Sequence, residues 1–191
     1  MNTYEATRQH KSGYSTIELT LLGAVLLVLA TSAFPTSMNA LRGYKLSGAA
    51  RSIAGQLALV RLRASADFTQ ARLNVNLTAG TYQIEVCTTK NTATGGCTTF
   101  TMEGGTQYLP NGISFSFGSI TTAASLQTTI AQTVPILFNS RGIPVDSTVN
   151  PTSNNALYVT DGKGNYYAVT VSVSGRELLV RRCFTRDVLG V

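Results

Sequence analysis

The stretch from Lys11 to Pro35, which reads KSGYSTIELTLLGAVLLVLATSAFP, limits what this chain can fold into more than any other segment. No charged residue occurs between Leu19 and Leu41. Extended back to Tyr14, the apolar run reaches about 20 residues, which is roughly the length at which a helix crosses a lipid bilayer. The segment therefore predicts a helix that enters a membrane.

Charged residues near the start of this segment predict its orientation in the membrane, and one of them, Glu18, needs a partner of opposite charge. Arg8 and Lys11 precede it, and positive charge favours the cytoplasmic side, so the rest of the chain should lie beyond the membrane. Glu18 lies just inside the apolar run, where an ionised side chain costs up to about 2.5–3.5 kcal/mol at the bilayer centre and less near its edge. No Lys or Arg follows within the next helical turns, so a positive partner would have to come from another molecule.

Three kinds of segment fit this apolar run. The first is a secretory signal that is cleaved near Thr31-Ser32-Ala33, and the second is a plain single-span anchor. Neither of these gives Glu18 a role. The third is a prepilin segment, because KSGYSTIE resembles the class III signal of type IV pilins and type II secretion pseudopilins.

This resemblance implies a set of functional residues. In that family, prepilin peptidase cleaves after the glycine, here Gly13, and the new N-terminal residue, here Tyr14, is methylated. The glutamate at the fifth mature position, here Glu18, pairs with the N-terminal amine of a neighbouring subunit during filament assembly. Pro35 matches a proline that weakens the helix in many pilins, because proline removes a backbone hydrogen bond. Residues 1–13 would then be a leader peptide.

The helical pattern continues beyond Pro35. From Leu41 to Val60, apolar residues recur at three- and four-residue spacing, which is typical of an amphipathic helix that packs on a domain. We expect this helix to end near Asp67, so that residues 14–68 form one transmembrane and amphipathic helix. The polar side predicts either a solvated helix face or contacts with neighbouring subunits or anionic lipid. Its basic residues are Arg42, Lys45, Arg51, Arg61 and Arg63.

From Arg72 onward, apolar and polar residues alternate, which is the period of a half-buried strand. LNVNL and TYQIEV predict a hairpin, as do ALYVT and YYAVTVSV around the turn DGKGN, and ELLVRRCF predicts a last strand. CTTFTM, ISFSF and Val134–Phe138 predict further strands, while Ser119–Gln132 fits either a surface loop or a weak strand pair. The fold class is therefore α+β, with a long helix packed on an antiparallel β domain over residues 69–191.

The residue content argues against an enzyme. His10 is the single histidine, and we find no catalytic motif, no cluster with metal-ligand spacing and no cofactor-binding motif, so we predict no catalytic residue, no metal and no cofactor. Cys87 and Cys97 flank a turn-rich loop, where they could form a disulfide in an oxidising compartment or remain free thiols. Cys183 fits the core of a terminal strand.

The second half of the chain narrows the resemblance. VPILFNSRGIP, a following hydrophobic hairpin and VSGR near the end resemble the GspH/FimT family of minor pilins and pseudopilins. In that family the helix packs against a pair of antiparallel sheets, and members lie at or near the tip of a filament. This implies a two-sheet β domain here.

Arginines near the end of the chain suggest an alternative role. Some FimT pilins bind DNA through a terminal G-R-x-R, and this chain has Gly175-Arg176-Glu177-Leu178, with Arg181 and Arg182 close by. Exposed arginines hold phosphates without reading sequence. The alternatives are a DNA-binding patch for DNA uptake, and residues that serve solubility or subunit contacts.

The sequence as a whole predicts a minor pilin or pseudopilin that primes or tips a type IV pilus or a type II secretion pseudopilus. Its partners would be other pilins or pseudopilins through the N-terminal helix, prepilin peptidase, inner-membrane lipid before assembly, and DNA in the alternative role. It would be a single-pass protein of the inner membrane with a periplasmic C-terminal domain, and would then move into the filament. The sequence does not distinguish a pilus from a secretion pseudopilus.

Overall fold

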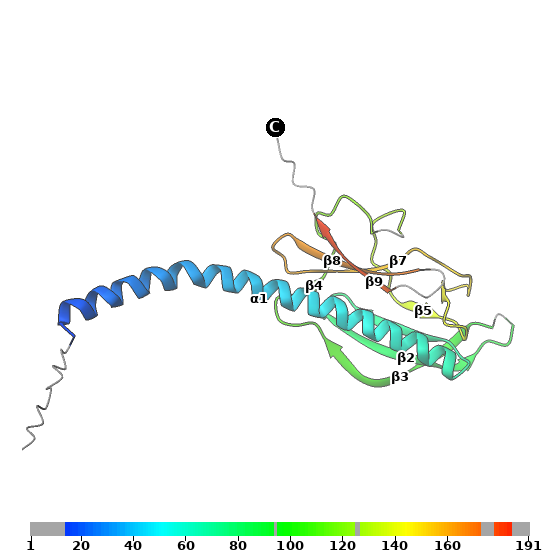
Figure 1. Ribbon diagram of the computed structural model, residues 1–191. Helices are drawn as coiled ribbons and strands as arrows, with labels where there is room; N and C mark the ends of the chain where they lie inside the picture. Colours follow the sequence, from blue (N-terminus) through cyan, green and yellow to red (C-terminus); the bar gives the residue numbers. More distant parts are fainter. Residues whose placement is uncertain (1–13, 94, 125–126, 173–177, 185–191) are drawn as a thin grey trace, which may run out of the picture. The chain divides into compact units, whose positions relative to one another are not determined.

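The computed structural model describes residues 14–93, 95–124, 127–172 and 178–184, and for residues 32–36 and 178–184 it describes the backbone only. It contains one long helix followed by nine strands in the described residues (Figure 1). The chain divides into two compact units, Met1–Ala40 and Leu41–Val191. The helix α1, Thr16–Ala66, contributes residues to both units.

The second half of α1 is amphipathic and packs on the β domain. Its fully or almost fully buried residues follow a three- and four-residue spacing, as the apolar face of a helix requires. These residues are Leu46, Ala49, Ala50, Ile53, Leu57, Val60 and Ala64. After Ala66, Phe68 adopts a left-handed conformation with φ 48°, and the chain turns into the first strand.

The first sheet has five strands in the order β3-β2-β1-β5-β6, and every pairing in it is antiparallel. A β1–β2 hairpin lies at its centre, in the register Leu73↔Ile84. β1 pairs with β5 from Ala71↔Phe138 to Leu73↔Ile136, where the ladder meets Pro135, a residue without a backbone N–H. The strands are β1 (Ala71–Asn76), β2 (Thr81–Lys90), β3 (Cys97–Tyr108), β5 (Ile136–Phe138) and β6 (Pro144–Val145).

The second sheet has four antiparallel strands in the order β4-β7-β8-β9. They are β4 (Ser114–Phe115), β7 (Asn155–Thr160), β8 (Asn165–Val171) and β9 (Leu178–Phe184). Every residue of β7 is buried, because both of its faces are covered. Leu157 and Val159 belong to the main core, while Ala156 and Tyr158 belong to a second apolar cluster with Ile120.

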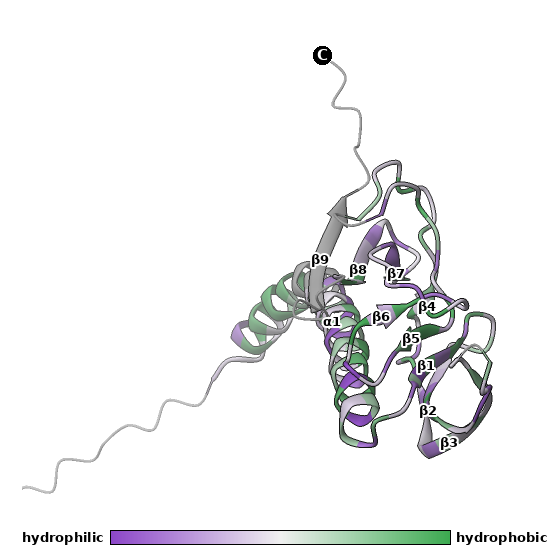
Figure 2. Ribbon diagram, turned by 90° about the vertical axis from the view of Figure 1, so that its right-hand side faces the viewer, coloured by the Kyte–Doolittle hydropathy of each residue, from purple (hydrophilic) through white to green (hydrophobic). Residues whose placement is uncertain are grey.

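The main core lies between the second half of α1 and the two sheets. It joins the buried helix face to inward residues of β1, β2, β5, β7 and β8, such as Leu73, Phe138 and Val169. In Figures 1 and 2 the helix ribbon runs along the β strands in this part of the chain. Burying one Leu- or Phe-sized side chain contributes about 1.5–3 kcal/mol, so the helix is an integral part of the β domain.

The structure confirms the predicted α+β class, with a long helix packed on two antiparallel sheets. Two expectations of detail were wrong. β3 continues to Tyr108, beyond the predicted CTTFTM, and β4 covers only two residues of ISFSF. The described part of Ser119–Gln132 contains no strand; it is a loop held by the buried Tyr158, whose hydroxyl donates to Gln127 Oε1 at 2.6 Å and accepts from Ala124 N at 2.9 Å.

Candidate assembly interface

Glu18 caps the start of α1. Its Oε2 accepts a hydrogen bond from the Ser15 backbone N–H at 3.0 Å, and the Ser15 carbonyl accepts the Leu19 N–H at 3.1 Å. This is one half of a capping box, in which the side chain three residues into the helix satisfies the backbone donor of the N-cap. The spacing Ser15-x-x-Glu18 carries that signal, and our reading of the sequence missed it. Glu18 therefore has a local role within the chain.

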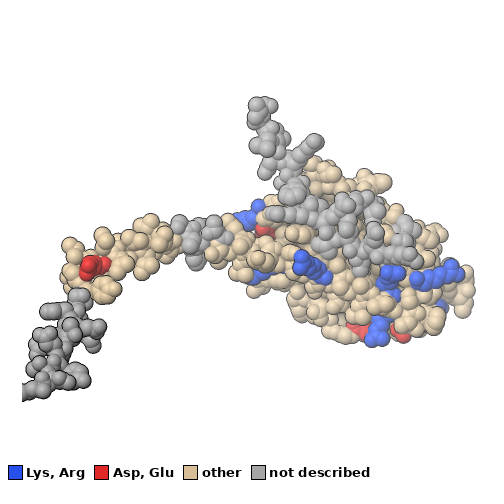
Figure 3. All heavy atoms as spheres, in the orientation of Figure 1, with Lys and Arg blue, Asp and Glu red and all other residues tan. Residues whose placement is uncertain are grey.

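The first half of α1 exposes nearly every large apolar side chain that the structure describes there. Ile17 is 74% exposed and Leu26 is 63% exposed, in contrast to the fully buried Leu46 further along the same helix. Figure 3 shows this stretch uncharged apart from acidic atoms near its start. The other large apolar residues exposed in this segment are Leu19, Leu21, Leu22, Val25, Leu27, Val28, Leu29 and Met38. A continuous exposed apolar surface of this kind marks a site of contact with a membrane or another protein. No other part of the chain that the structure describes buries it.

Among the described residues, no helix is both long enough and apolar enough to span a membrane.

The prepilin residues are distributed as follows. Gly13 lies outside the described residues, Tyr14 is 84% exposed just before the helix, and Glu18 lies in its first turn. Pro35 lies within α1, whose helical backbone is continuous from Thr16 to Ala66. The expected weakening at Pro35 does not interrupt the helix.

The backbone is partly similar to two solved structures. It is similar to that of a minor pseudopilin. A structure of EpsH from the type 2 secretion system of Vibrio cholerae aligns with a TM-score of 0.46 and 12% sequence identity, over 75% of this chain and 99% of that chain. A second EpsH structure gives a TM-score of 0.44 and 11% identity, over 75% of this chain and 96% of that chain. No protein-family model and no curated protein sequence matches the chain.

The arginine patch predicted near the C-terminus is only partly described. Arg176 lies outside the described residues. Arg181 and Arg182 lie in β9, where their backbones pair with Ala168 and Tyr167, but their side chains are not described. The alternative DNA-binding role therefore stays a prediction from the sequence.

Cys87 and Cys97 form a disulfide with a Cα–Cα distance of 5.8 Å. It joins β2 to the first residue of β3 and closes the loop between the two strands. Gln70 fastens the same loop, because its side chain accepts the Cys97 N–H at 2.9 Å and donates to the Gly95 carbonyl at 3.4 Å. This end of the first sheet is therefore held by covalent and polar contacts together. Cys183 lies in β9, and its side chain is not described.

A polar network covers the face of the first sheet that is turned away from α1. Glu85 is 7% exposed and accepts hydrogen bonds from Arg72 Nε at 2.6 Å, Asn74 Nδ2 at 2.8 Å and Gln83 Nε2 at 2.8 Å. The Arg72 guanidinium lies 4.0 Å from the centre of the Phe100 ring. These residues face one another across the β1–β2 ladder, so the network ties neighbouring strands together.

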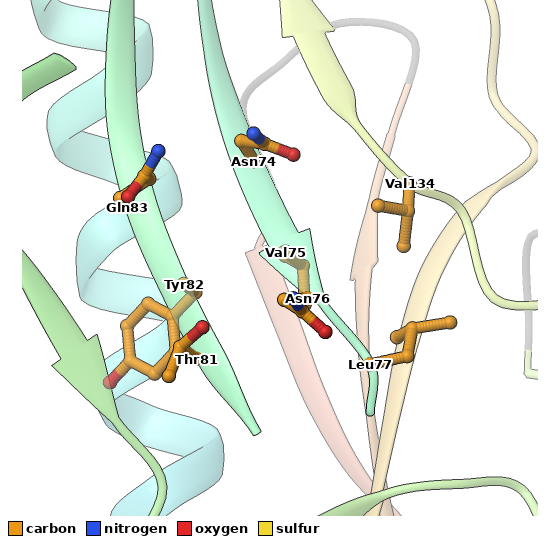
Figure 4. Close-up of a pocket in the computed structure, with 8 residues that line it drawn as sticks. All are labelled: Asn74, Val75, Asn76, Leu77, Thr81, Tyr82, Gln83 and Val134. Carbon is orange, nitrogen blue, oxygen red and sulfur yellow. The ribbon is translucent and has the colours of Figure 1, made fainter. Parts of the chain in front are cut away.

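A hollow of about 480 Å³ lies beside this network, at the end of the β1–β2 hairpin (Figure 4). Asn76 and Leu77 line it from one side and Val134 from the other. All three of its amide side chains are already used: Asn74 and Gln83 bind Glu85, and Asn76 Oδ1 accepts two backbone N–H groups of the hairpin turn. We therefore assign it no ligand. Within the described residues, no group of three or more His, Cys, Asp or Glu side chains could hold a metal ion.

Proposed function

We propose that this protein is a pilin-like subunit that assembles with other subunits through the first half of α1, as a minor pilin or pseudopilin of a type IV pilus or a type II secretion pseudopilus. The observation that carries this proposal is the contrast within one 51-residue helix. Its second half is buried in the main core, while its first half exposes one apolar side chain after another.

In this proposal the apolar surface is covered in two different environments, the membrane before assembly and neighbouring subunits after it. Before assembly, the segment from Tyr14 is inserted in the inner membrane, with the β domain in the periplasm. After assembly, the same side chains contact the equivalent helices of neighbouring subunits. Both environments remove apolar area from water, which favours burial by about 25 cal/mol per Å². The prepilin signal around Gly13 supports this sequence of events.

Glu18 has two roles in this proposal. In the free subunit its carboxylate caps the helix through Ser15 N–H, which holds the charge at the first turn. In the filament the same carboxylate pairs with the amine of Tyr14 from a neighbouring subunit, once prepilin peptidase has removed residues 1–13. Once such a pair lies in apolar surroundings, removing one partner is costly because it leaves an uncompensated buried charge.

Two substitutions separate these roles. Glu18→Gln retains an acceptor oxygen that can complete the capping box, but it removes the charge. Glu18→Ala removes both. The experiment expresses the full chain with its native assembly machinery and measures the intact mass of the membrane-bound protein, its helix content in detergent, and its amount in sheared or cross-linked filaments.

We expect the wild-type protein to begin at N-methylated Tyr14 and to enter filaments. Glu18→Gln should keep the helix content and lose filament incorporation by at least about tenfold, because breaking a buried ion pair costs about 3–5 kcal/mol. Glu18→Ala should in addition fray the first turn of the helix. A wild-type chain that still begins at Met1 beside an active peptidase, or Glu18→Gln protein that assembles normally, would refute the proposal.

A further inference from the structure

A second groove in the β domain carries features that the assembly role does not use. It has a volume of about 630 Å³, within the range of small-ligand pockets. Arg72, Phe100 and Leu137 line it from the first sheet. Residues 131–135, before β5, and the segment that leads from β6 to the start of β7 provide its other walls.

Asn155 lines this groove and carries an unsatisfied hydrogen-bond donor. The residue is 4% exposed, and Nδ2 has no hydrogen-bond partner among the described residues. Leaving a buried amide donor unpaired is unfavourable, because the group has lost its hydrogen bonds to water without gaining another partner. The neighbouring polar side chains are used elsewhere, since Gln132 bonds the backbone of Tyr158 and Thr133 Oγ1 accepts the Ala156 N–H at 3.1 Å.

Val149 adds a second local cost in the same groove. It has a φ of 69°, a left-handed conformation that a β-branched residue rarely adopts. The turn that holds it is built on Asp146, whose Oδ1 accepts the backbone N–H groups of Thr148 and Asn150 at 2.8 and 2.9 Å. Residues with a strained backbone are unfavourable for stability and are often found at ligand sites. Two unfavourable features therefore meet at one groove.

The lining defines the chemistry of a ligand. Apolar side chains, including Val134, Leu137 and Val149, alternate with polar groups around the groove. The charged residues that line it are Arg72 and Asp146, of which Arg72 is paired with Glu85, so the groove has no strong net charge to satisfy. The occupant that fits is neutral, with an acceptor oxygen beside an apolar side chain. An extended peptide has both, because each residue carries a carbonyl.

We propose that this groove binds an extended, neutral peptide segment of a partner protein, whose backbone carbonyl accepts a hydrogen bond from Asn155 Nδ2 and whose apolar side chain contacts Leu137 and Val149. The site lies entirely on the β domain and does not depend on the assembly role of α1. It would give the subunit a means of capturing a second protein through its β domain.

The test uses the full chain in detergent micelles, with N-acetyl-leucine N-methylamide as the peptide probe and octanoate as the lipid-like control. The readouts are the NMR signals of the Asn155 side-chain amide and of the Leu137 and Val149 methyl groups. We expect the peptide probe to shift all three sets of signals in a saturable way. Shifts caused by octanoate but not by the peptide probe would overturn the proposal in favour of an acyl-chain site.

Asn155→Leu separates a binding role from a structural role. If the amide serves a ligand, the variant should bind the probe about two- to tenfold more weakly, the worth of one hydrogen bond, and should be at least as stable as wild type because the unpaired donor is gone. Asn139→Leu is the matched control, because Asn139 Oδ1 accepts two backbone N–H groups, at 2.9 and 3.1 Å, and its loss should lower stability. An Asn155→Leu protein that unfolds more easily and binds the probe as well as wild type would overturn the proposal.

Discussion

Glu85 illustrates how a single buried carboxylate can make stability depend on pH. Burial alone would raise the pKa of Glu85, but the hydrogen bonds from Asn74, Gln83 and Arg72, with the charge of Arg72, outweigh burial and hold the pKa below its ordinary value of 4.5. The native state therefore favours the ionised form. Its contribution to stability is complete above the ordinary pKa and is lost as the pH falls through the lowered native pKa.

Glu85→Gln tests this contribution. The variant keeps the shape of the side chain but removes the charge, and we expect it to lose about 1.5–3 kcal/mol of unfolding free energy at neutral pH, as is typical of hydrogen bonds to a charged group. The difference from wild type should shrink in acid, below the ordinary pKa of 4.5. Urea unfolding of the full chain in detergent, followed by circular dichroism at several pH values, measures both effects.

Glu103→Gln is the control for this measurement. Glu103 pairs with Arg63 at 2.5 Å, but both side chains are more than a third exposed. Exposed pairs contribute about 0–1 kcal/mol, so this variant should change stability little. Equal losses of unfolding free energy from the two variants would show that the Glu85 network stabilises the protein no more than an exposed ion pair does.

At the level of elements, alternation and helical spacing predicted most of the fold because each strand or helix buries one face. The β1–β2 and β7–β8 hairpins follow directly from period two, as the second half of α1 follows from its three- and four-residue spacing. The extent of β3 was not predictable in this way, because Gly104 and Gly105 interrupt its pattern while the ladder with β2 continues to Tyr108. Pairing with a neighbour, and not the strand's own sequence, sets its length.

The candidate sites were less predictable than the fold, for a physical reason. The capping box at Ser15 and Glu18 is a local signal and could have been found from spacing. The groove at Asn155 could not, because its walls come from strands and loops that are distant in the sequence, and the loops carry no periodicity. An unpaired donor such as Asn155 Nδ2 can be recognised only when the three-dimensional positions of all neighbouring groups are known.

The turn between β5 and β6 shows how one element fixes the position of another. Gly142 has a φ of 69°, and a Cβ placed there would lie 2.9 Å from Ser65 Oγ and 3.0 Å from Arg61 Cγ, both on α1. Gly164, in the β7–β8 turn, has a φ of 87°, and nothing lies within 4 Å of its Cβ position. The two glycines therefore share the backbone requirement but not the contact with the helix.

Gly142→Ala and Gly164→Ala should consequently differ in cost. Both should lose about 1–2 kcal/mol from the left-handed backbone. Gly142→Ala should lose more than Gly164→Ala, because the Ser65 and Arg61 side chains must shift to admit the added methyl group. Urea unfolding of the two variants gives the comparison, and equal losses would mean that the turn does not press on α1.

At the scale of the whole molecule, the two compact units have opposite solvent requirements. The unit Leu41–Val191 contains the main core, and its exposed large apolar residues, such as Tyr44, Leu62 and Tyr108, are spread over several elements. The unit that precedes it contains the continuous exposed apolar run of α1. The exposed apolar surface of the first unit is therefore unfavourable in water, and covering it would be favourable.

This division predicts that a fragment of residues 41–191 folds and remains monomeric in buffer without detergent, while the full chain associates as soon as detergent is removed. The fragment retains the helix residues from Leu46 to Ala64 that contribute to the core, so its circular dichroism and its unfolding should match those of the β domain in the full chain. Size-exclusion chromatography with light scattering gives the oligomeric state. A fragment that aggregates although it is folded would place an association surface on the β domain itself. A full chain that stays monomeric in buffer would remove the physical reason for assembly through α1.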